Sequence, residues 1–122
     1  MIKIKRLIKS FKYAFAGLNK VFWEEQNFRL DFILALAVIL LAVILKIAIW
    51  EFIILVLVIA LVLILEIINS IFERLLDLLK PRIHQYVKDI KDMTAAAVFI
   101  AALAAVIIGL LIFLPYLVNF IK

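Results

Sequence analysis

The stretch Phe32–Leu65, FILALAVILLAVILKIAIWEFIILVLVIALVLIL, is almost entirely apolar and decides the fold. It is too long for one membrane crossing, because about 20 helical residues, each rising roughly 1.5 Å, cross a bilayer. Its polar interruption runs from Lys46 to Glu51 and includes Trp50. A snorkelling lysine, an interfacial indole and a carboxylate suit a tight turn at a membrane face. The stretch therefore predicts two membrane-spanning helices joined by a short turn.

The composition of the whole chain indicates a membrane protein. Its 122 residues are 70% hydrophobic with a mean hydropathy of +1.29, whereas globular proteins are about 45–50% apolar. The absence of cysteine excludes disulfides, thiolate nucleophiles and cysteine-ligated zinc. The basic start, Met1–Arg6, precedes no short apolar core with a cleavage site, so no cleaved signal peptide is expected. We predict an all-α integral membrane protein.

We expect one domain over residues 1–122, built from a surface region and three spans. The surface region covers residues 1–29, and the spans cover about 30–46, 51–70 and 94–117. The second span is expected to continue as an amphipathic helix to Leu79, where Pro81 ends it. A polar loop, Arg82–Asp92, is expected next, and Pro115 is expected to kink or end the third span.

The surface region has the pattern of an amphipathic helix over residues 4–22. Its apolar stripe comprises Ile4, Leu7, Ile8, Phe11, Phe15, Leu18 and Phe22, and Lys3, Lys5, Lys9, Lys12 and Lys20 lie largely off it. A lysine near an anionic leaflet contributes about 1 kcal/mol to membrane binding. We therefore expect this helix to lie on the membrane surface, since no soluble domain remains for it to pack against.

The distribution of basic residues predicts the orientation of the chain. Twelve of the fourteen lie before Leu30 or between Arg74 and Lys91, and Lys46 and Lys122 are the other two. The positive-inside rule then places the N-terminus in the cytoplasm and the C-terminus outside. Polar residues at the cytoplasmic interface would have access to nucleotides.

Polar residues enter the apolar sequence again at Leu65–Asp77, LEIINSIFERLLD. Four side chains at positions i, i+3, i+7 and i+11 share one helical face: Glu66, Asn69, Glu73 and Asp77. Ionisable groups at membrane depth are costly and are functional candidates by default. Glu66 and Glu73 are two turns apart, about 10 Å along the axis, so one metal ion is not easily bound by both. Glu25 is our candidate for the missing partner.

A glycine-rich phosphate cradle is absent, because Gly17 and Gly109 are the only glycines and no Walker-type or protein-kinase signature occurs. A phosphate-handling site would need carboxylates that bind magnesium, together with a lysine.

Alanine is frequent in the third span: Ala95, Ala96, Ala97, Ala101, Ala102, Ala104 and Ala105. Small residues let helices approach closely in lipid. Because three helices cannot enclose a polar site alone, we expect a homo-oligomer with sites at subunit boundaries. Packing within one chain is the alternative.

Several segments together carry a family resemblance. In chain order they are Ser10–Leu18, Glu25–Arg29, Glu66–Ser70, Glu73, Asp77, His84 and Lys91–Met93. This set resembles the prokaryotic diacylglycerol kinase family, which includes the undecaprenol kinases of Gram-positive bacteria. Asp31, Ile71 and Phe72 depart from the commoner pattern. The N-terminal region and the Asn69 to Glu73 segment look closer to the Gram-positive branch, which favours undecaprenol over diacylglycerol.

The resemblance implies a homotrimer of three-span subunits in a bacterial cytoplasmic membrane, with active sites shared between neighbours. Mg-ATP would phosphorylate a lipid alcohol at the cytoplasmic interface, and no nucleic-acid partner is expected. For the reaction, the resemblance implies Glu66 as general base beside Asn69, and Glu25 and Glu73 as metal ligands. For the nucleotide, it implies that Lys91 contacts the phosphates, that Asp92 is the essential acidic neighbour of Lys91, and that Asp77 and His84 lie near the nucleoside. Arg6 is implied to lie near the lipid.

Each residue also has an interpretation without catalysis. Glu66 could be a buried, protonated carboxyl, and Glu73 and Asp77 a solvated helix face. His84 could be a loop residue, Lys91 part of the positive-inside bias, and Asp92 a helix N-cap. For the whole chain, the alternatives are a small oligomeric channel or transport protein, or a non-catalytic scaffold.

Overall fold

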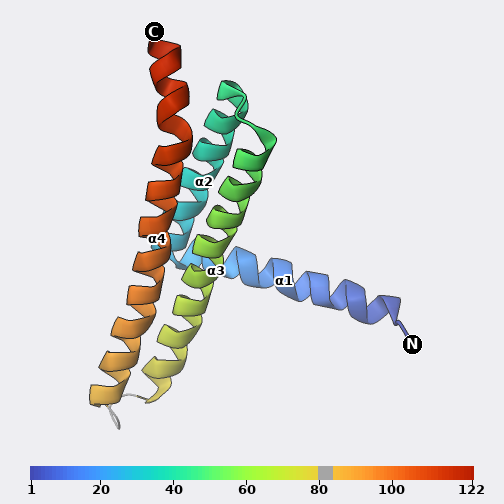
Figure 1. Cartoon of the computed structure of the whole chain (residues 1–122). Coiled ribbons are helices and arrows are strands. Elements are labelled where there is room, and N and C mark those ends of the chain that lie inside the picture. Colours follow the sequence, from blue (N-terminus) through green and yellow to red (C-terminus); the bar gives the residue numbers. More distant parts are fainter. Residues whose placement is uncertain (80–83) are drawn as a thin grey trace.

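A computed structural model describes residues 1–79 and 84–122, and only the backbone of His84. Its helices are α1 (Ile4–Glu24), α2 (Gln26–Leu45), α3 (Ile49–Leu79) and α4 (His84–Ile121), as Figure 1 shows. Helices α2, α3 and α4 are each long and apolar enough to cross a membrane. The prediction of an all-α protein with three spans is confirmed over the described residues.

The expected loop before the third span is wrong from His84 onward, because residues 84–92 form the first turns of α4. Two i,i+4 contacts support this polar part of the helix: Gln85 donates to Asp89 at 3.3 Å, and Lys88 pairs with Asp92 at 2.9 Å. Asp92 is therefore inside the helix and is not an N-cap. The expected helix stop at Pro81 and the start of the loop at Arg82 lie outside the described residues.

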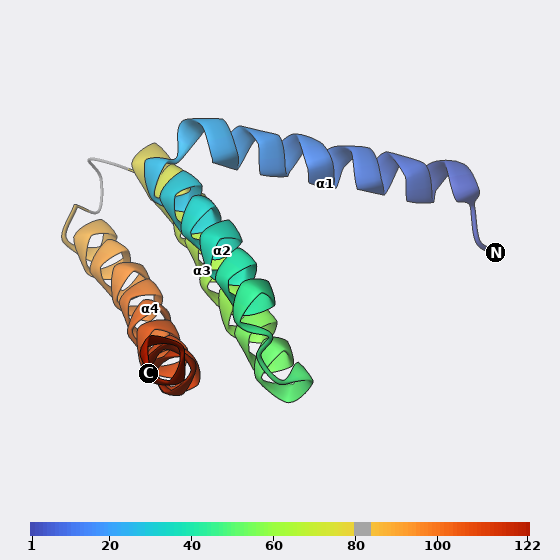
Figure 2. The same ribbon diagram turned by 90° about the horizontal axis from the view of Figure 1, so that it is seen from above.

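Helix α3 is the central helix of the bundle, because it packs against both α2 and α4. Figure 2 shows α2 lying along α3, with α4 beside them. The buried core lies near the α2–α3 turn and comprises Ala42, Leu55, Ile112 and Phe113. Other buried residues lie along the rest of the bundle, among them Phe28, Leu76, Val87 and Ala101, together with Glu66 and Ser70.

A groove of about 380 Å³ opens between α2, α3 and α4. Its lining is apolar, with residues such as Ala35, Val62 and Gly109, and Asp31 is its one charged lining residue. Gly109 faces open space, since an added Cβ would meet nothing within 4 Å. A single chain therefore leaves its bundle open along this side.

Helix α2 ends at a left-handed residue that is not glycine. Lys46 has φ 55°, and its N–H donates to the carbonyls of Ala42 and Val43. Lys46 thus caps the C-terminus of α2 in the left-handed conformation that Gly or Asn usually adopts at this position. This conformation costs free energy for other residues because of the Cβ atom.

A carboxylate fastens this turn to the last helix. Glu51 accepts hydrogen bonds from the Ala48 N–H at 3.1 Å and from the Tyr116 hydroxyl of α4. The same hydroxyl oxygen accepts from the Ala48 N–H at 3.1 Å. The α2–α3 turn, the start of α3 and α4 are thus joined by one half-buried cluster of hydrogen bonds.

Replacing Tyr116 with phenylalanine removes the hydroxyl but keeps the ring. We expect Tyr116→Phe to destabilise the protein by about 1–2 kcal/mol, because the Ala48 N–H and Glu51 lose a shared partner. Thermal unfolding in detergent measures the change. Tyr13→Phe is the matched control, since Tyr13 is 73% exposed, and equal melting temperatures for the two variants would contradict the role of the Tyr116 hydroxyl.

Helix α1 points away from the bundle and is joined to it near its C-terminal end, as Figure 2 shows. None of its residues is buried. Phe22 contacts Phe32 of α2 edge-on at 5.6 Å, and Arg29 donates to the carbonyls of Phe22 and Trp23 at 3.3 and 3.2 Å. Glu25, with extended backbone, forms the corner between the two helices. The position of Glu25 therefore depends on how this corner is held.

Candidate functional site

The polar face of α3 carries its most buried carboxyl at Glu66, which is 9% exposed. Asp31 of α2 faces Glu66 closely enough to hydrogen-bond with it. Ser70, one turn later, is buried and donates its hydroxyl proton to the Glu66 carbonyl at 3.1 Å. Asp31 also lines the apolar groove, so the Glu66 carboxyl that faces Asp31 lies beside the groove, where a carboxyl can exchange a proton with a hydroxyl.

Asn69 and Glu73 form the next turn of this face. The Asn69 Nδ2 donates to Glu73 Oε1 at 3.4 Å, and the Asn69 Oδ1 is buried without a hydrogen-bond partner. A buried amide oxygen without a donor is costly unless a ligand or cation satisfies it. Glu73 itself is exposed, so its carboxylate can reach a group arriving from outside the chain.

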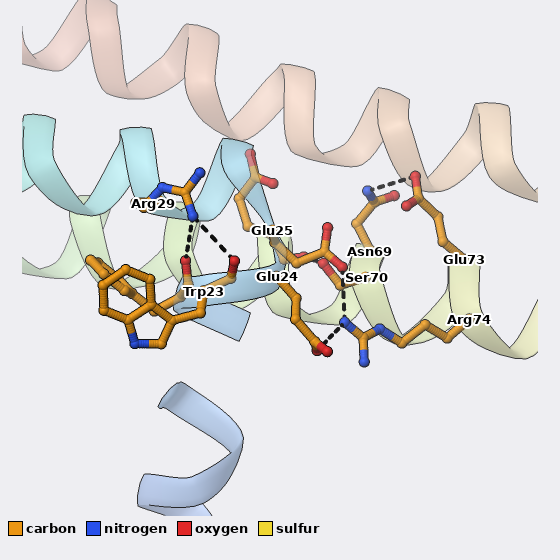
Figure 3. A network of polar contacts seen from close by, with 10 residues as sticks. Trp23, Glu24, Glu25, Arg29, Asn69, Ser70, Glu73 and Arg74 are labelled. Atoms are coloured by element: carbon orange, nitrogen blue, oxygen red, sulfur yellow. Dashed lines mark hydrogen bonds and ion pairs between the residues drawn. The ribbon is translucent and has the colours of Figure 1, made fainter. Parts of the chain in front are cut away.

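Glu25 joins this face from the corner between α1 and α2, and Figure 3 shows it with Asn69, Ser70 and Glu73. Glu73 and Glu25 each lie close enough to Glu66 for their charges to interact with its carboxyl. The structure thus brings Glu25 to the α3 polar face within one chain. Among the described residues, no three His, Cys, Asp or Glu side chains converge as a ready metal site.

Lys91 of α4 lies opposite Asp77 of α3. Its Nζ is 2.8 Å from Asp77 Oδ1, and the lysine side chain is 27% exposed. The ion pair bridges the two helices beyond Glu73, on the same α3 face. Asp92 is exposed and pairs with Lys88 on its own helix, so its carboxylate does not join the Glu66 cluster in this chain.

Arg6, like Asp92, is not brought to this cluster. Arg6 lies in the first turn of α1, whose N-terminal part extends away from the bundle (Figure 1). His84 begins α4, but its side chain lies outside the described residues.

Three residues that hold the site together are not indicated by the sequence pattern. Asp31 faces Glu66, Arg29 binds the end of α1, and Arg74 binds Glu24 and Glu25. The Arg74 contacts join residues about 50 positions apart, so no local spacing could reveal them. For Asp31 one feature of the sequence could have indicated a role in the site, because it is an ionisable residue at the start of an apolar run.

Together these elements define a class of protein. Apolar helices hold carboxylates, an amide and a lysine at one end of a membrane bundle, and the apolar groove is lined by Asp31, which faces the buried carboxyl of Glu66. Such a set can bind a cation and phosphate oxygens and can accept a proton, as a membrane-embedded phosphotransferase requires.

Comparisons with known proteins agree with this class. Residues 12–113 match the family model for prokaryotic diacylglycerol kinase. An undecaprenol kinase of Bacillus subtilis is 36% identical over 94% of both chains. A diacylglycerol kinase of Synechocystis is 38% identical over 93% of this chain and 65% of its own, and one of Escherichia coli is 33% identical over 84% of both. The chain belongs to the prokaryotic diacylglycerol kinase family and is a lipid kinase.

Proposed function

We propose that this kinase transfers the γ-phosphate of Mg-ATP to the hydroxyl of a membrane lipid alcohol, with undecaprenol preferred over diacylglycerol. The observation that carries the proposal is the buried Glu66 beside the groove and next to the Asn69 and Glu73 turn. The preference for undecaprenol is supported by the undecaprenol kinase relative, whose match covers 94% of both chains. One lipid kinase domain would span residues 1–122.

Glu66 is proposed as the general base. Its carboxylate would accept the proton of the lipid hydroxyl as the hydroxyl oxygen attacks the γ-phosphorus and the bond to the β-phosphate oxygen breaks. Asn69, one turn away, would hold the reacting groups in place. Asp31 would share the hydrogen bonds of this pocket, because it already faces Glu66.

Magnesium fits the donors that the chain offers. Glu25 and Glu73 supply carboxylate oxygens, and the unpartnered Asn69 Oδ1 supplies a neutral oxygen beside them. Magnesium binds few protein carboxylates and keeps waters and substrate phosphates as its other ligands. When bound, it would neutralise charge on the phosphate oxygens.

Lys91 is proposed to bind nucleotide phosphates. Its ion pair with Asp77 would hold the ammonium at the α3–α4 interface until a phosphate competes for it. Asp77 and His84 would lie near the nucleoside, and Asp92 would support Lys91 from the next position in the chain.

A homotrimer with composite sites is our proposal for the assembly, in a bacterial cytoplasmic membrane with a cytoplasmic N-terminus. The open side of the bundle and the distance of the α1 start from the polar cluster both support it. Helix α1 would lie on the membrane surface, and Arg6 would contact lipid there.

Side-by-side assays test the proposed substrate. Purified protein in detergent should consume ATP when undecaprenol is added, and more slowly when diacylglycerol is added at the same mole fraction. Turnover with both lipids should disappear when magnesium is chelated. Faster turnover of diacylglycerol would contradict the substrate preference, and an absence of ATP consumption with either lipid would contradict the proposed reaction.

A further inference from the structure

Arg74 links α3, the central helix of the bundle, to the corner that carries Glu25. Its Nη2 lies 3.0 Å from Glu24 Oε2 and 3.2 Å from Glu25 Oε1, as Figure 3 shows. Arg74 belongs to α3, Glu24 ends α1, and Glu25 separates α1 from α2. One guanidinium nitrogen therefore ties three segments together.

The electrostatics of the site call for such a cation. Asp31, Glu73 and Glu25 all repel the carboxyl of Glu66, and Glu24 adds a fifth acidic group beside Glu25. Like charges brought together destabilise an arrangement unless a cation lies among them. Arg74 follows Glu73 directly in α3 and supplies that positive charge from within the chain.

The contact with Glu25 leaves part of its carboxylate available. Arg74 reaches Oε1, and Oε2 accepts no hydrogen bond among the described residues. Glu24 is half exposed, with a side-chain accessibility of 50%, whereas that of Glu25 is 28%. Glu24 is thus the outer anchor of Arg74, and Glu25 is the inner one, turned toward the polar face.

We propose that Arg74 is a positioning residue: by binding Glu24 and Glu25 it fixes the α1–α2 corner, and with it the Glu25 carboxylate, against the polar face of α3. This deepens the proposed function, since it rests on Glu25 as a magnesium ligand. The corner itself is a property of the protein without nucleotide or metal. It can therefore be tested separately from catalysis.

Distance measurement tests the corner directly. The chain has no cysteine, so Lys12→Cys in α1 and Leu78→Cys in α3 can be spin-labelled without a background, and labelled protein is diluted with unlabelled protein. In the absence of magnesium and nucleotide, we expect a narrow distance distribution that broadens when Arg74→Ala is added. Arg74→Lys should give an intermediate width, because it keeps the charge but loses the planar fork.

A charge exchange provides the rescue. Arg74→Glu alone should broaden the distribution, and the double variant Arg74→Glu with Glu24→Arg should narrow it again, because an opposite-charge pair is restored. Lys20→Ala is the matched control, since it removes an exposed cation of α1 close to the corner and should leave the distribution unchanged.

Nucleotide kinetics provide the second readout. The pairs are about half exposed, so each contributes modestly, and Arg74→Ala should raise the KM for Mg-ATP about fivefold with a change in kcat of less than about twofold. The double charge-exchange variant should recover most of this increase. Lys20→Ala should leave the KM unchanged.

The possible outcomes test the tether, which is the link that Arg74 makes to Glu24 and Glu25, separately from the lipid kinase reaction. Unchanged distance distributions in Arg74→Ala and Arg74→Glu would overturn the positioning role, whatever the activity. Broadening with an unchanged KM for Mg-ATP would overturn the link between the corner and the metal site. Broadening in a protein that phosphorylates no lipid would support the tether and would refute the proposed function instead.

Discussion

Glu66→Gln is expected to lower kcat for lipid phosphorylation by about 100- to 10,000-fold, the range that general-base catalysis supplies. Glutamine keeps the size and the hydrogen-bonding shape of glutamate, but its amide cannot accept the hydroxyl proton. Because Glu66 is buried and is not part of the Lys91–Asp77 ion pair, where we propose that the nucleotide binds, nucleotide binding should persist. Turnover and nucleotide titration, measured on the same preparation, distinguish the two effects.

Glu51→Gln is the matched control for this experiment. It makes the same chemical change in the same helix, at the opposite end, where Glu51 binds Ala48 and Tyr116. Glutamine can still accept a hydrogen bond from the Ala48 N–H, so turnover should stay near the wild-type value. A folded Glu66→Gln protein that phosphorylates lipid at the wild-type rate would refute the assignment of the base.

The second large effect concerns the proposed metal ligands, Glu25 and Glu73. Removing a residue that only hydrogen-bonds to a metal ligand weakens metal binding roughly 10- to 100-fold. Glu25→Ala and Glu73→Ala remove proposed ligands themselves, so each should weaken Mg-ATP binding by at least this factor. Each substitution removes a carboxylate oxygen next to the unpartnered Asn69 Oδ1. Calorimetric titration of Mg-ATP into detergent-solubilised protein measures the loss. Asp89→Ala is the control, because Asp89 is an exposed carboxylate of α4 that pairs with Gln85 on its own helix.

Mixing the two weakened variants tests whether the sites are composite. If Glu25 and Glu73 of one site come from neighbouring subunits, hybrid trimers of Glu25→Ala and Glu73→Ala chains regain one intact site, and part of the activity returns. No recovery, in a mixture whose subunits have exchanged, would place both carboxylates in one chain. Mg-ATP titrations that match wild type would remove both residues from the metal site.

The fold could be predicted from the sequence because the membrane imposes simple rules. An apolar run of this length must cross the bilayer as helix, and Lys46 to Glu51 was the one place where the first two spans could separate. The loop expected over residues 84–92 is wrong because most of these residues are polar, and their polarity alone suggests a loop. Their i,i+4 contacts form a solvated helix instead, and polarity alone does not separate these two structures.

The site could be predicted only as far as helical spacing reaches. Glu66, Asn69 and Glu73 share a face because they are three and four residues apart, and α3 presents them so. The partners of these residues come from other helices. Asp31 facing Glu66, and Arg74 binding Glu24 and Glu25, depend on how the helices pack and on the angle at which α1 leaves the bundle.

The core of Ala42, Leu55, Ile112 and Phe113 lies near the α2–α3 turn, which Glu51 and Tyr116 fasten to α4. The end with Glu66 and Glu73 also buries Leu76 and Val87, but its helices are joined in addition by ion pairs that are partly exposed. Cooperative burial resists local opening better than exposed ion pairs do. Amide protons should therefore exchange slowly beside the turn and faster toward Asp77. Bound substrates would slow amide exchange at the end with Glu66 and Glu73, because they bind only the ordered form of this end.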